Sequence, residues 1–431
     1  MIDYITIYTI LLAIMLAVAI ARKNSLVLIA ILIYYTAVGI MGIVGVRIAD
    51  LDEFQSQTTI LPYLFLIICY AIHFSPLMRN NNGFDSQKVN AIDLSQYKLL
   101  IYAFIFAGAV SIILYIRPVL SLISSEAWKS NRILLLDDEI VYPYSNRIEY
   151  LMLNFSNYFA LPLLIISTII ISKGGNKILG WTTLIISIAY RVLACLYTSS
   201  RGGIFNLAIM TIVIFIFFLK DMKKTSKTFS IFLGITAVIV LFPVMASITA
   251  DRFGDDFAST SVWRYFGQPA IMFSYSVVPI KRLALGRYAF SRIFDTGYSS
   301  FDYGGKWEIG GNWGSVFFTF VGYEYIDWGP IGCLLIGGII AWIMNKIITK
   351  ETYRPSDLYL IFSYIQFLVN GCLVIGRNYT LQIILTLVVY GIMRFLFESN
   401  KSPRTDKENI ADINMTSTIE PLNCDEGQNN A

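Results

Sequence analysis

The chain has 431 residues, of which 56% are hydrophobic and 14% are charged, and its mean hydropathy is +0.62. No soluble domain needs so much apolar sequence, and the composition indicates a polytopic membrane protein. The net charge of +4 is modest and no basic cluster alternates with aromatic residues, which argues against nucleic acid as a partner.

The apolar stretches predict an all-α integral membrane fold. A helix needs about 20 apolar residues to cross a bilayer, and this length gives about eleven transmembrane helices. They are expected at 2–20, 25–46, 58–75, 99–116, 151–172, 178–197, 204–219, 229–248, 329–347, 358–375 and 379–397. Residues 1–398 then form the transmembrane domain. The first helix is expected to be retained and not cleaved as a signal peptide, because no Lys or Arg precedes it.

Lysine and arginine are concentrated in alternate short loops between these helices, as at 22–23 and 220–227, whereas the loop at Arg201 holds one basic residue. The positive-inside rule makes the basic loops cytoplasmic, with the N-terminus extracytoplasmic and the C-terminus inside. The tail at 399–431 is polar, and we expect it to be disordered and cytoplasmic.

Two predicted outer loops are long, at 117–150 and 249–328. Within the second, the stretch 313–328 is apolar but too short to cross comfortably, and Glu324 and Asp327 interrupt it. We therefore expect a large extracytoplasmic loop with a re-entrant segment that packs against protein. Asp327 also precedes a Gly-Pro step and the next helix, which predicts that it is a helix N-cap.

The sequence SSRGG at 199–203 opens a predicted helix on the outer face. Free amides at a helix N-terminus, a guanidinium group and glycines that let an anion approach the backbone together favour a phosphate site. Arg201, Gly202 and Gly203 are therefore candidate diphosphate-binding residues, and Arg201 is also a candidate catalytic residue. The alternative is an arginine that extends to the membrane interface beside a flexible turn.

Further arginines extend this basic set. Arg191 lies inside a predicted helix, where an unpaired charge costs on the order of 3 kcal/mol, so it requires a polar cavity or an ion-pair partner. Arg264 and Tyr265, in WRYFGQP, and Arg287, in GRYAF, lie in the long outer loop. Each loop arginine alone suits a solvated surface, but together with Arg201 they predict a binding surface for a polyanionic head group. Arginine suits bidentate recognition of phosphate.

Glu324 is a candidate proton acceptor or hydroxyl-orienting group, because partial burial makes a carboxylate more basic. His73, the one histidine of the chain, lies at the predicted cytoplasmic end of the third helix, and we expect it to be remote from Glu324. Histidine and cysteine show no metal-ligand spacing, so no metal is expected. Asp50 and Asp52 lie in an acidic turn that suits either a divalent cation or, more simply, an interfacial turn.

The motifs together resemble those of a known family. SRGG before a helix, RYFGQP, GRYAF, and a segment that ends in DWGPIG are similar to motifs of the bacterial oligosaccharide repeat unit polymerases of O-antigen and capsule, which are related to O-antigen ligases. The motifs span residues 190–335. The resemblance implies a membrane glycosyltransferase fold of the GT-C-like type with an outer catalytic cavity, in the bacterial inner membrane.

The resemblance also implies the reaction. A polymerase of this family transfers the growing glycan from undecaprenyl diphosphate to a hydroxyl of the next lipid-linked unit, and essential arginines of the family map to Arg201, Arg264 and Arg287. The lipid diphosphate is itself an activated donor, so neither a cofactor nor a metal is required. Implied partners are lipid-linked glycans, the lipid bilayer, and a chain-length regulator and flippase of the same pathway.

Three alternatives remain. O-antigen ligases use an outer-loop histidine, which this chain lacks. A flippase for lipid-linked oligosaccharides predicts internal symmetry and charge spread through the bundle, whereas the predicted charge here is concentrated outside. A metal-dependent transferase would use Asp50 and Asp52.

Overall fold

The structure is a computed structural model that describes residues 3–49, 51–78, 84–90, 94–125, 143–173, 175–228, 257–279, 283–287, 289–290, 319–373 and 379–398. In two helices, α9 (Arg201–Phe218) and α11 (Phe257–Met272), the side chains of Arg201 and Arg264 lie outside the described part. The predicted helix 229–248 and the tail also lie outside it. Throughout the described ranges the elements are helices, and none of them is a strand.

Eight helices in these ranges are long and apolar enough to cross a membrane. They are α1 (Tyr4–Ala21), α2 (Leu26–Ile48), α4 (Ile60–Phe74) with η1 (Ser75–Leu77), α5 (Leu94–Ser125), α7 (Arg147–Lys173), α8 (Lys177–Tyr197), α13 (Phe320–Ile348) and α15 (Tyr379–Ile392) with η5 (Met393–Phe397). Helix α9, whose apolar stretch Gly202–Phe218 is shorter, and helix α14 (Pro355–Gly371) occupy two further predicted positions and are not among the eight. The all-α membrane class is confirmed, and the number eleven stays a prediction.

Two stretches of the predicted outer loops are helical. Helix α5 continues to Ser125, beyond the predicted end at residue 116, so the loop expected at 117–150 is shorter. Residues 257–277 of the loop expected at 249–328 form α11 and the π-helical turn η3 (Phe273–Val277). The sequence analysis counted only the apolar residues needed to cross a bilayer. A helix continues beyond that length wherever its backbone hydrogen bonds continue.

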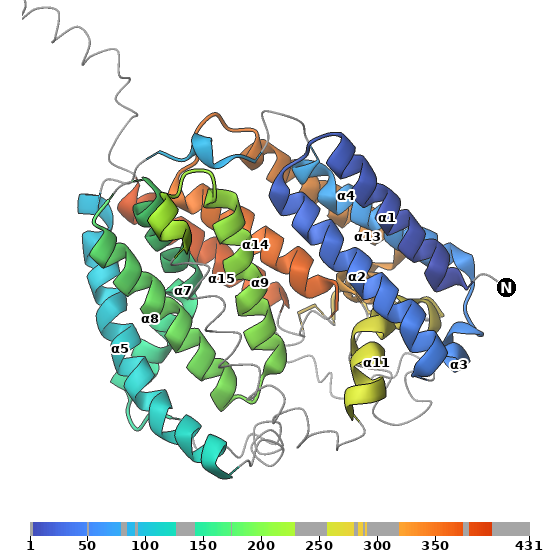
Figure 1. Ribbon diagram of the computed structural model, residues 1–431, viewed down its shortest axis with the longest axis horizontal. Helices are drawn as coiled ribbons and strands as arrows, with labels where there is room; N and C mark the ends of the chain where they lie inside the picture. Colours follow the sequence, from blue (N-terminus) through green and yellow to red (C-terminus); the bar gives the residue numbers. More distant parts are fainter. Residues whose placement is uncertain are drawn as a thin grey trace, which may run out of the picture.

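The helices form two groups that lie side by side (Figure 1). One group contains α1, α2, α4, α11 and α13, and the other contains α5, α7, α8, α9, α14 and α15. Helix α9 contacts α2, and α14 contacts α13, so these pairs join the groups. The hydroxyl of Tyr35 on α2 donates a hydrogen bond to the carbonyl of Leu368 on α14 at 2.6 Å, inside the junction.

Glycines set the distance between α2 and α11. A Cβ added to Gly267 would lie 2.7 Å from both the Cα of Gly42 and the carbonyl oxygen of Met41, so the two backbones are in direct contact. Gly39 and Gly45 lie on the same side of α2, where added Cβ atoms would meet Thr9 and Leu51 at 2.7 Å. Small residues at this spacing allow membrane helices to pack closely.

The basic loops lie together at one end of the helices. The amide of Tyr353 donates to the carbonyl of Lys88 at 2.8 Å, and Lys23 and Lys220 line one shared hollow. This is the grouping that the positive-inside rule predicts. Which compartment this end faces stays a prediction.

Candidate functional site

Helix α13 is two helices joined at a sharp bend. Gly329 has φ 66° and ψ −171°, a conformation essentially restricted to glycine, and Pro330 follows it. The thiol of Cys333 lies 3.6 Å from the carbonyl oxygen of Val321, whereas positions this far apart on a straight helix are separated by about 18 Å. The half-helix 320–328 therefore folds back along 330–348, and the two segments are named the α13 hairpin.

The half-helix is buried between α4, the second segment of the hairpin and η3. The ring of Tyr325 lies 6.0 Å from that of Phe65 on α4 and 5.7 Å from that of Phe273 on η3. Residues 320–328 thus pack against protein, which a re-entrant segment requires, because lipid offers no partner for irregular backbone. Residues 313–318 lie outside the described ranges, and the depth of the hairpin in the bilayer stays a prediction.

The turn at 283–290 docks on the C-terminal end of the half-helix. The amides of Ala284 and Leu285 donate hydrogen bonds to the carbonyls of Ile326 and Asp327 at 2.8 and 3.0 Å. The last carbonyls of a helix have no partner within the helix, so this turn supplies the missing donors. The GRYAF and DWGPIG patches of the sequence are therefore in direct contact.

Asp327 strengthens the same contact from the opposite direction. Its side chain is fully buried, and it accepts hydrogen bonds from the amides of Gly286 at 3.1 Å and Ala289 at 2.8 Å. The prediction that Asp327 caps the following helix is wrong, because the bend at Gly329 turns that helix back and the carboxylate binds the docked turn instead. Gly286 has φ 83°, which disfavours any other residue, and a Cβ added there would lie 3.1 Å from the ring of Trp328.

Glu324 faces His73, which contradicts the expectation that these residues are remote from each other. Glu324 is 4% exposed and His73 is fully buried. The Nε2 atom of His73 and the Oε2 atom of Glu324 are 3.8 Å apart, and neither atom makes a hydrogen bond within the described ranges. The fold-back of the half-helix explains the contact, since it carries Glu324 along α4 and brings Phe320 to 4.7 Å from the imidazole ring.

The predicted helix start is present in α9, but the amide of Gly203, which was expected to be free for an anion, already donates a hydrogen bond within this turn. The helix begins at Arg201, and Ser200 is the N-cap, whose hydroxyl accepts a hydrogen bond from the amide of Gly203 at 3.2 Å. Gly203 packs against Cys195 of α8, where an added Cβ would come within 2.6 Å of the sulfur. Gly202 is exposed and has no neighbour within 4 Å of an added Cβ. The open part of this turn is thus at Gly202.

The first turns of α9 lie beside α11, which carries the RYFG patch. The ring of Phe205 is 5.7 Å from that of Phe266 and 6.1 Å from that of Tyr34 on α2. Tyr265 is half-buried, and its ring lies 5.2 Å from that of Phe266. Tyr265 also packs against the hydrophobic core, and its contact with a glycan stays a prediction.

Arg191 has a hydrogen-bond partner that the sequence did not indicate. Its Nη1 atom donates to the side-chain carbonyl of Asn157 on α7 at 2.8 Å, and the side chain is half-buried. No carboxylate within ion-pair distance of Arg191 is found in the described ranges. The expectation of a polar partner is met by an amide, which leaves the positive charge of Arg191 uncompensated in this part of the protein.

Arg287 is exposed and lies on the turn that docks against the α13 hairpin. The structure therefore connects the motif segments in one series of contacts: the start of α9 with α11, η3 with the half-helix, and the half-helix with the turn that bears Arg287. Glu324 is the exception. Its side chain is in the interior beside His73, whereas Arg287 is at the surface.

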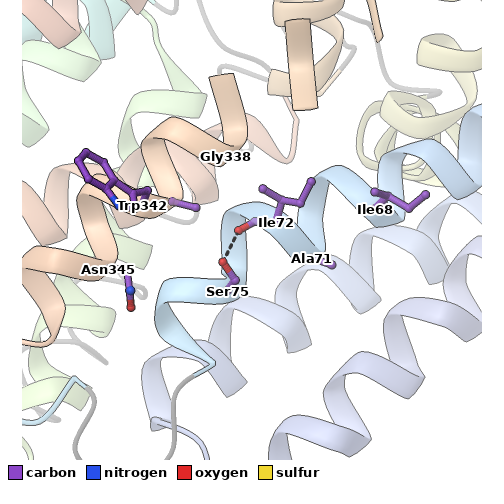
Figure 2. Close-up of a pocket in the computed structure, with 8 residues that line it drawn as sticks. Ile68, Ala71, Ile72, Ser75, Gly338, Trp342 and Asn345 are labelled. Atoms are coloured by element: carbon purple, nitrogen blue, oxygen red, sulfur yellow. Dashed lines mark hydrogen bonds between the residues drawn. The ribbon is translucent and has the colours of Figure 1, made fainter. Parts of the chain in front are cut away.

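A groove of about 650 Å³ lies between α4 and the second segment of the α13 hairpin (Figure 2). Ile68, Ile72 and Ser75 face Trp342 and Asn345 across it. The lining contains no charged side chain, so this groove is unsuited to a diphosphate. Its apolar walls are those expected of a surface that faces lipid chains.

The acidic turn at Asp52 and Glu53 is exposed. Asp52 and Glu53 begin the short helix α3 (Asp52–Gln55) and are both exposed, and Asp50 lies outside the described ranges. Across the described ranges, no group of three or more His, Cys, Asp or Glu side chains is arranged to hold a metal ion. Comparisons of the chain with models of known protein families, with curated proteins and with solved structures found no match.

Proposed function

We propose that this protein is a glycosyltransferase that polymerises oligosaccharide repeat units carried on a polyprenyl diphosphate. The observation that supports the proposal most is the series of contacts joining α9, α11, the half-helix and the turn at 283–290. Short motifs that are spread over the sequence from 199 to 332 are neighbours in space. Such convergence is expected of one functional surface.

The reaction needs cations where its leaving group forms. The anomeric C–O bond of the donor breaks, and the lipid diphosphate leaves with the bonding electrons. A hydroxyl oxygen of the acceptor forms the new bond to the anomeric carbon, and its proton passes to the released diphosphate or to water. Guanidinium groups placed before the reaction stabilise the developing charge. Arg201 and Arg264 come from the neighbouring helices α9 and α11, and Arg287 comes from the docked turn. Arg191 adds a positive charge without a described carboxylate partner.

A second candidate has an observation in its favour. The broken helix α13, with the buried His73–Glu324 pair inside the bundle, is a kind of feature found in transporters. A flippase for the same lipid-linked units would use the basic residues to hold the head group and the hairpin to move it. The motif contacts favour the polymerase, and the hairpin alone favours the flippase.

The surface polysaccharide of a strain that lacks this protein distinguishes the two candidates. The polymerase predicts that single repeat units still reach the outside and appear on gels as one short band in place of a ladder. The flippase predicts that surface repeat units disappear altogether. Restoration of the ladder by the wild-type gene is the control, and an unchanged ladder in the deletion strain would contradict both functions.

A further inference from the structure

Within the described ranges, neither His73 nor Glu324 has a second charged partner. The pair distance is 3.8 Å, and both side chains are almost completely enclosed. No other acid and no lysine or arginine lies within ion-pair distance of either residue in the described ranges. Both imidazole nitrogens and the Oε2 atom of Glu324 also lack hydrogen-bond partners there.

Among the residues that the structure describes, the other titratable groups around the pair are thiols and phenols. They lie on α4, on the second segment of the hairpin and on α14. The groups are Cys69, Tyr70, Cys333 and Tyr364. The phenol of Tyr364 on α14 donates a hydrogen bond to the backbone carbonyl of His73. Ordinary thiols and phenols are neutral between about pH 5 and 8, so none of these groups supplies a compensating charge.

The number of protons on the pair then decides its net charge. With no proton the pair carries the charge of the carboxylate, and with two protons it carries the charge of the imidazolium. With one proton it is neutral, whether that proton is on the imidazole or on the carboxyl group. An uncompensated charge inside a membrane bundle is costly, and this cost favours the state with one proton over the two charged states.

We propose that His73 and Glu324 form an interior proton-binding site that holds a single proton between them. The proton resides on Nε2 of His73 or on Oε2 of Glu324, and the pair is neutral in both cases. Transfer from one atom to the other requires them to approach from 3.8 Å to hydrogen-bond distance. The site joins the half-helix 320–328 to α4 without placing net charge in the interior. It does not depend on the glycosyltransferase proposal and holds equally for a transporter.

The single histidine of the chain makes the proposal directly measurable. The full-length protein, purified with a tag that contains no histidine and labelled with ¹⁵N-histidine, gives one imidazole spectrum, which reports whether His73 is neutral or doubly protonated. Infrared spectroscopy reports whether Glu324 is protonated, with the band assigned by its loss in Glu324→Gln. The experiment follows both signals between about pH 5 and 8, where an ordinary histidine titrates.

We expect one of the two groups, and not both, to be protonated throughout this range. Two protons or none at any pH within it would overturn the proposal, as would a histidine that titrates while the carboxyl signal stays constant. The His73 spectrum should also shift in Glu324→Gln, and an unchanged spectrum would show that the groups are not in contact. Tyr364→Phe removes the neighbouring phenol but leaves the imidazole in place, so it should keep the wild-type proton count. Should Glu324→Gln fail to fold, a titration of wild-type His73 within this range would still overturn the proposal.

Discussion

At the C-terminal end of the half-helix 320–328, Asp327 accepts hydrogen bonds from two backbone amides, at 3.1 and 2.8 Å. One turn earlier, Glu324 faces the imidazole of His73 at 3.8 Å and makes no hydrogen bond through Oε2 within the described ranges. Both carboxyl groups are buried. Both carboxylate oxygens of Asp327 accept hydrogen bonds from the turn at 283–290, whereas Oε2 of Glu324 can still accept one. The comparison separates a carboxylate that holds the fold from one that is available for proton chemistry.

The largest effect is expected for Asp327→Asn. The amide side chain has one acceptor oxygen in place of two, and its NH₂ group then faces a backbone amide that is itself a donor. Loss of a charge-assisted hydrogen bond and of one acceptor in a buried site costs about 3 kcal/mol of unfolding free energy. Thermal unfolding in detergent, followed by tryptophan fluorescence, measures this. An unchanged melting temperature would show that the docked turn does not depend on Asp327.

A smaller loss of unfolding free energy is expected for Gly267→Ala, which tests the packing of α11 against α2. The added Cβ would lie 2.7 Å from backbone atoms of α2, so the two helices have to separate. Overpacking of this kind costs about 2 kcal/mol. Gly338→Ala is the matched control, because an added Cβ there has no neighbour within 4 Å, and alanine in a helix is more stable than glycine by about 1 kcal/mol. Equal losses in the two variants would contradict the close contact of α2 and α11.

The smallest loss is expected for Glu324→Gln, which sharpens the comparison of the two carboxylates. The change keeps the size of the side chain and removes no hydrogen bond of Oε2, so we expect less than about 1 kcal/mol of destabilisation. The same unfolding experiment compares it with Asp327→Asn. A loss of unfolding free energy as large as that of Asp327→Asn would mean that Glu324 also stabilises the fold.

The sequence predicted the re-entrant segment for a sound physical reason. Glu324 and Asp327 interrupt a stretch that is too short to cross, and backbone of this kind needs protein partners. The contact between Glu324 and His73 was beyond prediction, because a bend at one glycine decides which part of α4 the half-helix meets. The position of His73 along its predicted helix indicated its depth in the membrane. It did not indicate that the half-helix 320–328 would pack beside it.

The helix at 257–277 was also missed, although α2 contained a signal for it. Gly39, Gly42 and Gly45 recur on one face of α2, and such a face predicts close approach by other helices. The sequence does not say which segment approaches, and here α1 and α11 do so. The hydrogen bond from Arg191 to Asn157 was predictable only in part. The sequence indicated that Arg191 needs a polar partner, but tertiary packing decides which residue that partner is.

The most direct test of the account measures chain elongation by the purified protein in lipid nanodiscs. Lipid-linked repeat units are supplied as both donor and acceptor, without nucleotide sugar and without added metal, and the products are separated on gels. The account predicts a ladder of polymer lengths with the wild-type protein and an elongation rate about a hundredfold lower for Arg201→Lys, which should purify in equal yield. Single units left unchanged by the wild-type protein, or polymer of normal length from Arg201→Lys, would contradict it.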